Sequence, residues 1–237
     1  FRRSNNIYNA PGVPADGMVA TGGVISDYTD SGSVYRAHIF TSSGTFTVTD
    51  DNSAFGTDVE YVVVAGGGGS GYDLSGGGGA GGYRSSVTGE STGGGGSLES
   101  ALPVSVQSYA ITVGAGGAGG RLGSNNGAQG GESFIGPPSS KLVPATGGGY
   151  GANAVNGQTG GAGGSGGGGS AYNSTGGSGT TNQGYAGGSS STVYVASGGG
   201  GAGSAGVAGQ TPSTGGNGGN GLASSVTGTS VTRAGGG

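Results

Sequence analysis

Residues 59–69 read VEYVVVAGGGG, and the two halves of this stretch are made of different material. The first half is a run of mostly apolar, β-branched residues, which is typical of a strand that is buried on both faces. The second half is glycine, and each interior glycine costs a helix about 1 kcal/mol relative to alanine. The stretch therefore predicts a central strand over residues 59–65 that runs directly into a glycine-rich segment without helix.

The composition of the whole chain changes at the same junction. Residues 1–64 hold 7 glycines and 10 charged residues, whereas residues 65–237 hold 61 glycines and 8 charged residues. Ahead of the junction, residues 1–33 are rich in Asn, Pro, Gly and Asp, which indicates an extended arm or linker with turns. We therefore divide the chain into this arm, a β-strand segment over residues 34–65, and a glycine-rich domain over residues 66–237.

Two β-prone runs in the second segment predict a hairpin. Residues 34–40 (VYRAHIF) and 45–49 (TFTVT) are joined by the turn-like sequence TSSG. In the second run the two apolar residues alternate with threonines, so they face one side of the strand. Together with residues 59–65, the hairpin makes a short antiparallel patch in which Val62 and Val64 are buried.

Glycine tracts recur through the rest of the chain with irregular spacing. They alternate with β-prone inserts at residues 102–106, 109–113, 192–196 and 226–232. No Gly-X-Y register is present, so a collagen triple helix is excluded. Glycine and proline together make 75 of the 237 residues, which on composition alone favours a flexible linker. The low charge and the seven tyrosines of this region favour order instead.

A packed state is available to such tracts. In the polyproline-II conformation the backbone has three residues per turn and no internal hydrogen bonds, so its N–H and C=O groups point sideways. Neighbouring tracts can then bond to each other if no side chain keeps them apart, which only glycine permits. We therefore expect a mostly β and irregular fold with essentially no helix, in which a short antiparallel β patch precedes a packed polyglycine-II-type domain with loops. The sequence NNG at residues 125–127 reads as a turn.

The sequence also excludes several kinds of site. No cysteine is present, which rules out disulfides and thiolate metal sites. His38 is the sole histidine, so histidine-based triads and metal clusters lack partners, and we interpret it as a strand residue. A G-x-G-x-x-G match at residues 76–81 carries little weight, because no helix follows it to hold a phosphate. We therefore expect no enzyme activity and no catalytic, cofactor-binding or metal site.

Charge and hydropathy limit the partners. The net charge is −4, and the six arginines and one lysine are scattered along the chain, which argues against nucleic acid. No apolar run approaches the roughly 20 residues of a membrane span, so we expect no membrane insertion. The chain begins at Phe1 and ends within a glycine run, and we interpret it as part of a longer polypeptide.

Tyrosines among Gly, Ser and Asn are the candidate contact residues. This is the composition of binding loops, in which rigid amphipathic rings lie beside adaptable hydrogen-bonding groups. Tyr72, Tyr172 and Tyr185 lie between tracts rather than in β-prone inserts, so they are the best candidates for surface contacts. The alternative interpretation is that the tyrosines cover the ends of the packed tracts.

Four stretches carry a resemblance to a known family. They are residues 38–46 (HIFTSSGTF), 59–69 (VEYVVVAGGGG), 78–84 (GGAGGYR) and 109–117 (YAITVGAGG). In these stretches the chain resembles the glycine-rich domain of bacteriophage tail-fibre and other virion-appendage proteins. The resemblance implies a distal fibre or adhesin module, a kind of module that in some members is a sandwich of packed polyglycine-II helices whose loops touch the host surface.

The same resemblance implies a structural or adhesive virion protein, located in a virion appendage or outside the cell. Its expected partners are a bacterial surface glycan or outer-surface protein, together with other virion fibre proteins or its own copies in a homo-oligomer. The alternative is a self-assembling extracellular filament or matrix protein, whose partner is its own neighbour.

Overall fold

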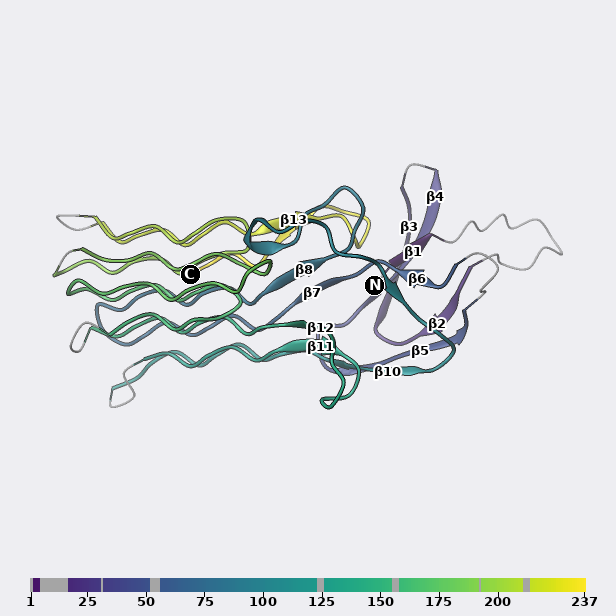
Figure 1. Ribbon diagram of the computed structural model, residues 1–237, viewed down its shortest axis with the longest axis horizontal. Coiled ribbons are helices and arrows are strands. Elements are labelled where there is room, and N and C mark those ends of the chain that lie inside the picture. Colours follow the sequence, from purple (N-terminus) through teal and green to yellow (C-terminus); the bar gives the residue numbers. More distant parts are fainter. Residues whose placement is uncertain are drawn as a thin grey trace.

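The described residues form strands and extended segments, with no α-helix among them. The computed structural model describes residues 2–4, 17–30, 32–51, 56–122, 126–154, 158–191, 193–210 and 214–237. Within these ranges the one helical element is a 3-10 turn, η2 (Gly93–Gly95), and Gly94 inside it has a non-helical φ of 66°. Small antiparallel sheets lie at one end, and long extended segments run away from them (Figure 1). The prediction of a β-rich fold with essentially no helix is confirmed.

The largest sheet has five strands in the order β12-β11-β10-β5-β2. Its strands are β2 (Val19–Thr21), β5 (Gly44–Asp50), β10 (Ser108–Thr112), β11 (Ser133–Ile135) and β12 (Leu142–Ala145). Side chains alternate between the two faces of a strand, and accordingly Phe46 and Val48 of β5 are buried, as are Tyr109 and Ile111 of β10. These four side chains belong to a hydrophobic cluster that also contains Met18, Val59 and Ile135.

A bent hairpin links this sheet to a second one, which has the order β1-β4-β3. The second sheet consists of β1 (Arg2–Ser4), β3 (Val24–Asp30) and β4 (Ser33–Ile39). The outer half of the hairpin consists of β3 and β4, which pair with each other in the three-stranded sheet. The inner half consists of β2 and β5, which pair with each other in the five-stranded sheet. The bend falls at Gly22 and Gly23, which have φ values of 108° and 67°.

Two expectations about this region are wrong. Residues 34–40 and 45–49 do form strands, but these strands pair with β3 and β2 and not with each other. The described part of residues 1–33 is not an extended arm, because β2 and β3 lie within it and are bonded into the two sheets. In the sequence the Gly22-Gly23 pair and the aspartates of β3 indicate turns. These turn signals make the β-prone runs of β2 and β3 difficult to recognise.

The strand expected over residues 59–65 is interrupted. It is split into β6 (Asp58–Val59), which pairs with β9 (Leu102–Pro103), and β7 (Val62–Val64), which pairs with β8 (Tyr83–Ser85). The three valines of β7 are half-buried, so the expectation that Val62 and Val64 are buried is wrong. The strands β13 (Leu222–Ser224) and β14 (Val231–Arg233) pair with each other.

The extended segments are the described residues within 66–82, 114–131, 146–221 and 234–237, and we call them the array (Figure 1). Their backbone hydrogen bonds have a period of three. Ser165 and Gly168 donate to the carbonyls of Ala80 and Gly77 at 2.9 and 2.8 Å. The same interval recurs on other sides of this tract, in the bonds Gly166 N–Tyr185 O, Gly169 N–Gly188 O, Gly149 N–Ser165 O and Ala152 N–Gly168 O. A backbone that presents every third residue to the same neighbour has the symmetry of a polyglycine-II helix.

Each inner tract bonds in several directions at once. Residues 165–169 exchange backbone hydrogen bonds with six other segments, at residues 77–80, 149–152, 161, 177, 185–188 and 197–200. The array is therefore held together by main-chain bonds between tracts and needs no conventional hydrophobic core.

Glycine is required in the tracts because its missing side chain lets two backbones meet. A Cβ atom at Gly167 would lie 1.8 Å from the carbonyl oxygen of Tyr150, and one at Gly199 would lie 2.0 Å from that of Gly78. Neither glycine has a positive φ, so backbone conformation is not the reason for glycine at these positions.

Gly127 belongs to the same class, so it is a lattice glycine and not the turn glycine expected from residues 125–127, of which Asn125 lies outside the described residues. A Cβ atom at Gly127 would lie 2.0 Å from the carbonyl oxygen of Gly69, and its N–H donates to Gly151 O at 3.2 Å. A glycine that does face open space is Gly215, since a Cβ atom there would meet nothing within 4 Å.

Candidate binding surface at the tip of the array

The tracts leave the sheets, turn back at the far end and return, so several loops lie together at that end (Figure 1). Residues 66–71 follow β7 outwards and residues 76–82 return to β8, with a bend at residues 72–74 between them. We call the described residues 72–74, 121–122, 171–173 and 193–194 the tip loops. They lie at the turns between outgoing and returning tracts and can present side chains to a partner.

Two of the predicted contact residues lie in adjacent tip loops. The N–H of Ala171 donates to the carbonyl of Leu74 at 3.1 Å, which joins the loop of Tyr72 to the loop of Tyr172. The side chains of Tyr72 and Tyr172 are 43% and 45% exposed, and Leu74 beside them is 45% exposed. The fold thus brings two exposed tyrosines, 100 positions apart in the sequence, to one end of the molecule.

The backbone of both loops is strained. Asp73 and Leu74 have φ values of 54° and 34°, and Tyr172 and Asn173 have φ values of 68° and 57°. A non-glycine residue with a positive φ, in the left-handed region, costs roughly 1–3 kcal/mol and persists only where its surroundings fix that conformation. Such strain concentrates at binding and switch regions in proteins, which makes these loops the candidate functional site.

Local hydrogen bonds hold the strained loops in place. Ser75 Oγ donates to Gly71 O at 2.8 Å across the loop of Tyr72. Across the loop of Tyr172, the N–H of Ser170 donates to Ser174 Oγ at 3.0 Å, and Ser174 Oγ donates in turn to the carbonyl of Gln158. Ser170 and Ser174 are buried, so these bonds are shielded from water. The two tyrosines therefore project from loops that are fixed before any partner binds.

Other tip residues were missed from the sequence. Tyr194 is 69% exposed and Val193 is 43% exposed, although they belong to the β-prone insert at 192–196. Their described backbone is a bend and not a strand, because the tracts on either side already pair with other segments. Leu122 is 85% exposed and carried no signal of its own. Position between two glycine tracts, rather than β propensity, is the signal that would have found them.

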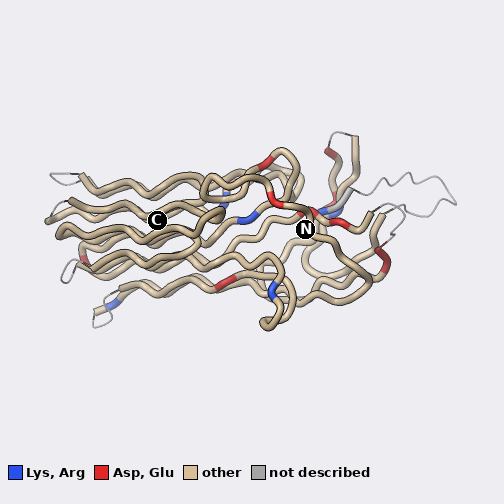
Figure 2. Tube along the Cα trace, viewed as in Figure 1, with Lys and Arg blue, Asp and Glu red and all other residues tan. Residues whose placement is uncertain are grey.

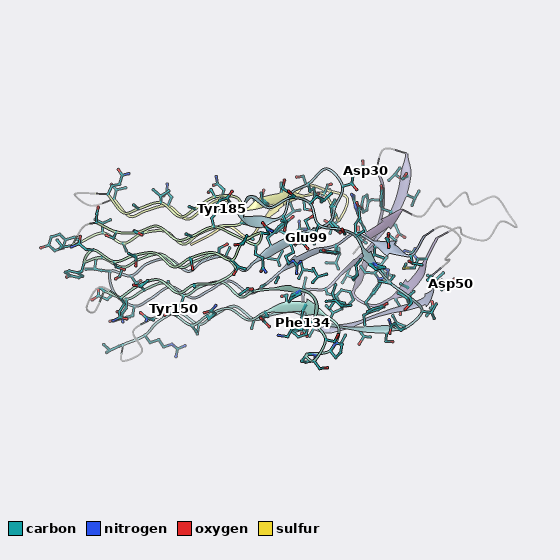
Figure 3. All side chains as sticks on the ribbon, viewed as in Figure 1. Asp30, Asp50, Glu99, Phe134, Tyr150 and Tyr185 are labelled. Atoms are coloured by element: carbon teal, nitrogen blue, oxygen red, sulfur yellow. The ribbon has the colours of Figure 1, made fainter. Side chains whose placement is uncertain are left out.

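Tyr185 is not brought together with the other two candidates. Its N–H donates to Gly201 O at 3.0 Å and its carbonyl accepts from Gly166 N at 2.9 Å, so its backbone is part of the lattice. Its side chain is half-buried, and a Cβ atom at Gly95 would lie 2.7 Å from its hydroxyl. It therefore packs against the η2 turn, toward the sheet end of the array, and Tyr150 lies elsewhere along the array (Figure 3).

The sequence of residues 41–237 matches the family described as the glycine-rich domain. The chain belongs to this family. The match covers β5, the later sheets and the whole array, and it crosses the boundary expected between residues 65 and 66. The strands β1, β2, β3 and β4 precede it. No curated protein and no solved structure matches the chain.

The glycine-rich domain has almost no charge in its array. Residues 146–221 contain no charged residue, and the tip loops contain only Asp73 and Arg121 in the described part of the chain. The other charges lie mostly among the sheets (Figure 2), where Arg84 and Glu99 form a bidentate pair with N–O distances of 2.8 and 2.6 Å. Apart from Asp73 and Arg121, the tip loops therefore offer hydrogen bonds, ring stacking and apolar burial for contacts.

His38 lies in β4, ahead of the glycine-rich domain, and has a structural environment. It is 6% exposed, and its Nδ1 donates to the carbonyl of Gly22 at 2.8 Å, next to the bend of the hairpin. Its ring meets Phe46 edge-on with 5.1 Å between centroids. Burial lowers the pKa of His38, although the hydrogen bond to Gly22 opposes this, so the ring is neutral near pH 7.

The sheet end offers one further hollow, an apolar cleft of about 310 Å³ between β4, β7, β10 and β11. Val63, Ile111, Phe134 and Arg233 are among its lining residues. The described residues hold no group of three or more His, Cys, Asp or Glu side chains suited to a metal ion. Within the same residues, no helix is long and apolar enough to cross a membrane. The tip loops remain the best-defined candidate surface.

Proposed function

We propose that this protein is a structural and adhesive module of a virion appendage, such as a bacteriophage tail fibre or its tip, and that it attaches to a host cell surface through the tip loops. The observation that carries the proposal is the pair of exposed tyrosines, Tyr72 and Tyr172, in two adjacent and pre-formed loops at the end of the array. The resemblance of residues 38–46 and 59–69 to phage fibre proteins supplies the biological setting.

The array suits this role because it holds its loops still. A binding surface that is ordered before contact avoids the entropy cost of fixing loops and side chains on association. Tyrosine offers a large ring with few rotatable bonds, and the neighbouring Ser and Asn offer hydrogen bonds. The partner is a bacterial surface glycan or an outer-surface protein, and the sheet end is the side on which other fibre proteins attach.

The proposal is tested by binding to intact bacteria. Fluorescently labelled protein is added to a panel of bacterial strains and bound label is measured by flow cytometry. The double variant Tyr72→Ser/Tyr172→Ser should lose at least about tenfold in affinity, since two aromatic side chains that become buried on binding each contribute more than about 1 kcal/mol. The matched control is Val24→Ser, which removes a 67% exposed apolar side chain from β3, among the sheets at the other end.

Two results would overturn the proposal. One is an absence of binding by the wild type to every strain of a broad panel. The other is equal binding by the wild type and the double variant to a strain that the wild type does recognise. Competition with purified surface polysaccharide, set against competition with purified outer-surface proteins, assigns the partner class in a strain that gives a signal.

The alternative role, a self-assembling filament or matrix protein, is favoured by one observation. The outer tract at residues 114–120 leaves Gly116 and Gly119 exposed, and the nearest atoms to a Cβ there are 3.8 Å away. Such a backbone can accept another tract from a second copy. Electron microscopy of the purified protein separates the two roles, because filaments that grow with concentration support assembly and discrete particles support the adhesive module.

A further inference from the structure

The tracts of the array share one axis, which runs from the sheets to the tip loops (Figure 1). Their hydrogen bonds join neighbouring tracts, so the bonds lie across this axis. Residues 66–71 show the pattern. Among the described residues they are held by eight backbone bonds, namely Gly66 N–Gly131 O, Gly68 N–Gly79 O, Gly69 N–Ala128 O, Gly117 N–Gly67 O, Gly120 N–Ser70 O, Gly148 N–Gly66 O and Gly151 N–Gly69 O, at 2.8 to 3.0 Å, and Gly71 N–Gly76 O at 3.4 Å.

We propose that the array is a mechanical element that transmits tension between the tip loops and the sheets. Tension on a tip loop pulls its tract along its own length. All lateral bonds of that tract are then sheared together, and none can break without the others. The inference rests on the proposed function in one respect, since it takes the tip loops as the point at which a partner pulls.

The close contacts between backbones strengthen the same arrangement. A Cβ atom added at Gly127 would lie 2.0 Å from the carbonyl oxygen of Gly69. A Cβ atom added at Gly69 would lie 2.0 Å from the carbonyl oxygen of Ala118. Neighbouring tracts are thus seated in each other's grooves. Sliding one tract past another must lift it over these contacts as well as break its bonds.

Force across the array acts differently. The outer tract at residues 114–120 donates two bonds to the tract at 66–71, Gly117 N–Gly67 O and Gly120 N–Ser70 O, each at 2.8 Å. A sideways pull on Ala118 loads the bonds nearest to it first and then the next ones. The tract therefore peels from the array one bond after another, and each step needs less force than shearing a whole tract.

Single-molecule force spectroscopy on the whole chain tests this directional difference. The protein contains no cysteine, so two introduced cysteines define the pulling direction. The axial pair is Ser42→Cys with Tyr72→Cys, which joins the sheet end to a tip loop. The lateral pair is Ala118→Cys with Ala208→Cys, which lie in the lowest and highest tract pairs of Figure 1 and are exposed. We expect the axial rupture force to exceed the lateral force at least about twofold, because several bonds of similar strength share the axial load.

A matched pair of variants separates the lattice from the handles. Gly69→Ala places a side chain against Ala118 O within the loaded tract, whereas Gly215→Ala adds one in open space. The first should lower the axial rupture force and the second should leave it unchanged. Circular dichroism at rest confirms that each variant is folded before it is pulled.

Equal rupture forces in the two directions would overturn the inference, as would equal axial forces for Gly69→Ala and Gly215→Ala when both are folded. These measurements use chemical handles and no receptor. A protein that fails to bind any bacterium but resists axial force would therefore refute the adhesive role alone. One that binds bacteria but shows no directional difference would refute the mechanical role alone.

Discussion

At the residue scale, the array depends on what glycine lacks. At a tract glycine such as Gly167, the carbonyl oxygen of Tyr150 lies 1.8 Å from the position that a Cβ atom would take. The N–H of Gly167 donates to Gly161 O at 2.9 Å. A side chain there would push two backbones apart and break the bonds on both. Gly215 is also a glycine but has no such neighbour. Comparing substitutions at the two positions therefore distinguishes the effect of close packing from the effect of losing a glycine.

Valine substitutions at these positions should therefore differ in effect. Gly167→Val and Gly199→Val each remove several lateral bonds worth about 1 kcal/mol apiece, so we expect a loss on the order of 3 kcal/mol or more. Gly215→Val should stay within about 0.5 kcal/mol of the wild type, as surface changes usually do. Thermal unfolding measures all three. Equal and mild effects would mean that the tracts are linkers.

His38 gives the protein a dependence on pH at the sheet end. An unfolded histidine has a pKa of about 6.5, and burial lowers the pKa of His38 in the folded state. The unfolded chain therefore binds more protons just below pH 6.5, and stability falls as the pH is lowered through this range. The variant His38→Asn keeps a donor for the carbonyl of Gly22 and does not titrate.

Urea unfolding at pH 7.5 and pH 5.5 tests this assignment. The wild type should lose more stability between the two pH values than His38→Asn does. An identical pH dependence in both proteins would show that His38 is not the group responsible.

At the scale of elements, alternation along a strand could be predicted from the sequence, but strand pairing could not. The buried pair Phe46 and Val48 follows from local period-2 patterning. The partners of β4 and β5 depend on the bend at Gly22 and Gly23, which steers the chain between two sheets. The same limit explains β7, whose apolar run suggests burial on both faces while its valines are half-buried beside the cleft.

This difference in burial should appear in truncation energies. Phe46 is 2% exposed within the hydrophobic cluster, so Phe46→Ala should cost about 3–5 kcal/mol. Val63 of β7 is half-buried, so Val63→Ala should cost about 1 kcal/mol. Denaturant unfolding provides both values, and a larger loss at Val63 would show that its exposed face is covered in solution.

At the scale of the whole molecule, polyglycine-II packing follows from glycine content and low charge, but the order of the tracts does not. Tyr72 and Tyr172 could be identified as loop residues because each lies between tracts. Their adjacency depends on the bond from Ala171 to Leu74, and the tracts are too alike for their sequences to specify which ones become neighbours. Tyr194 was missed for a local reason, since its β-branched neighbours suggested a strand.

The lack of charge in the array leads to a prediction for the whole molecule. Raising the salt concentration from about 0.1 M to about 1 M shortens the Debye length from about 10 to about 3 Å. Because residues 146–221 carry no charge and the described tip loops hold only Asp73 and Arg121, one of each sign, attachment through the tip should change less than about twofold in affinity over this range. Flow cytometry at the two salt concentrations measures it, and a steep fall would place the contact at the charged sheet end instead.

The tracts are joined to each other by main-chain bonds, and this has a consequence for evolution. The tip loops contribute few side chains to the lattice, so a loop can change in sequence and length while the tracts on either side keep their register. Mutations that alter recognition are thereby uncoupled from mutations that alter folding. A library randomised at residues 72, 172, 193 and 194 should yield mostly folded members, and such a protein can explore new surfaces without first acquiring a new scaffold.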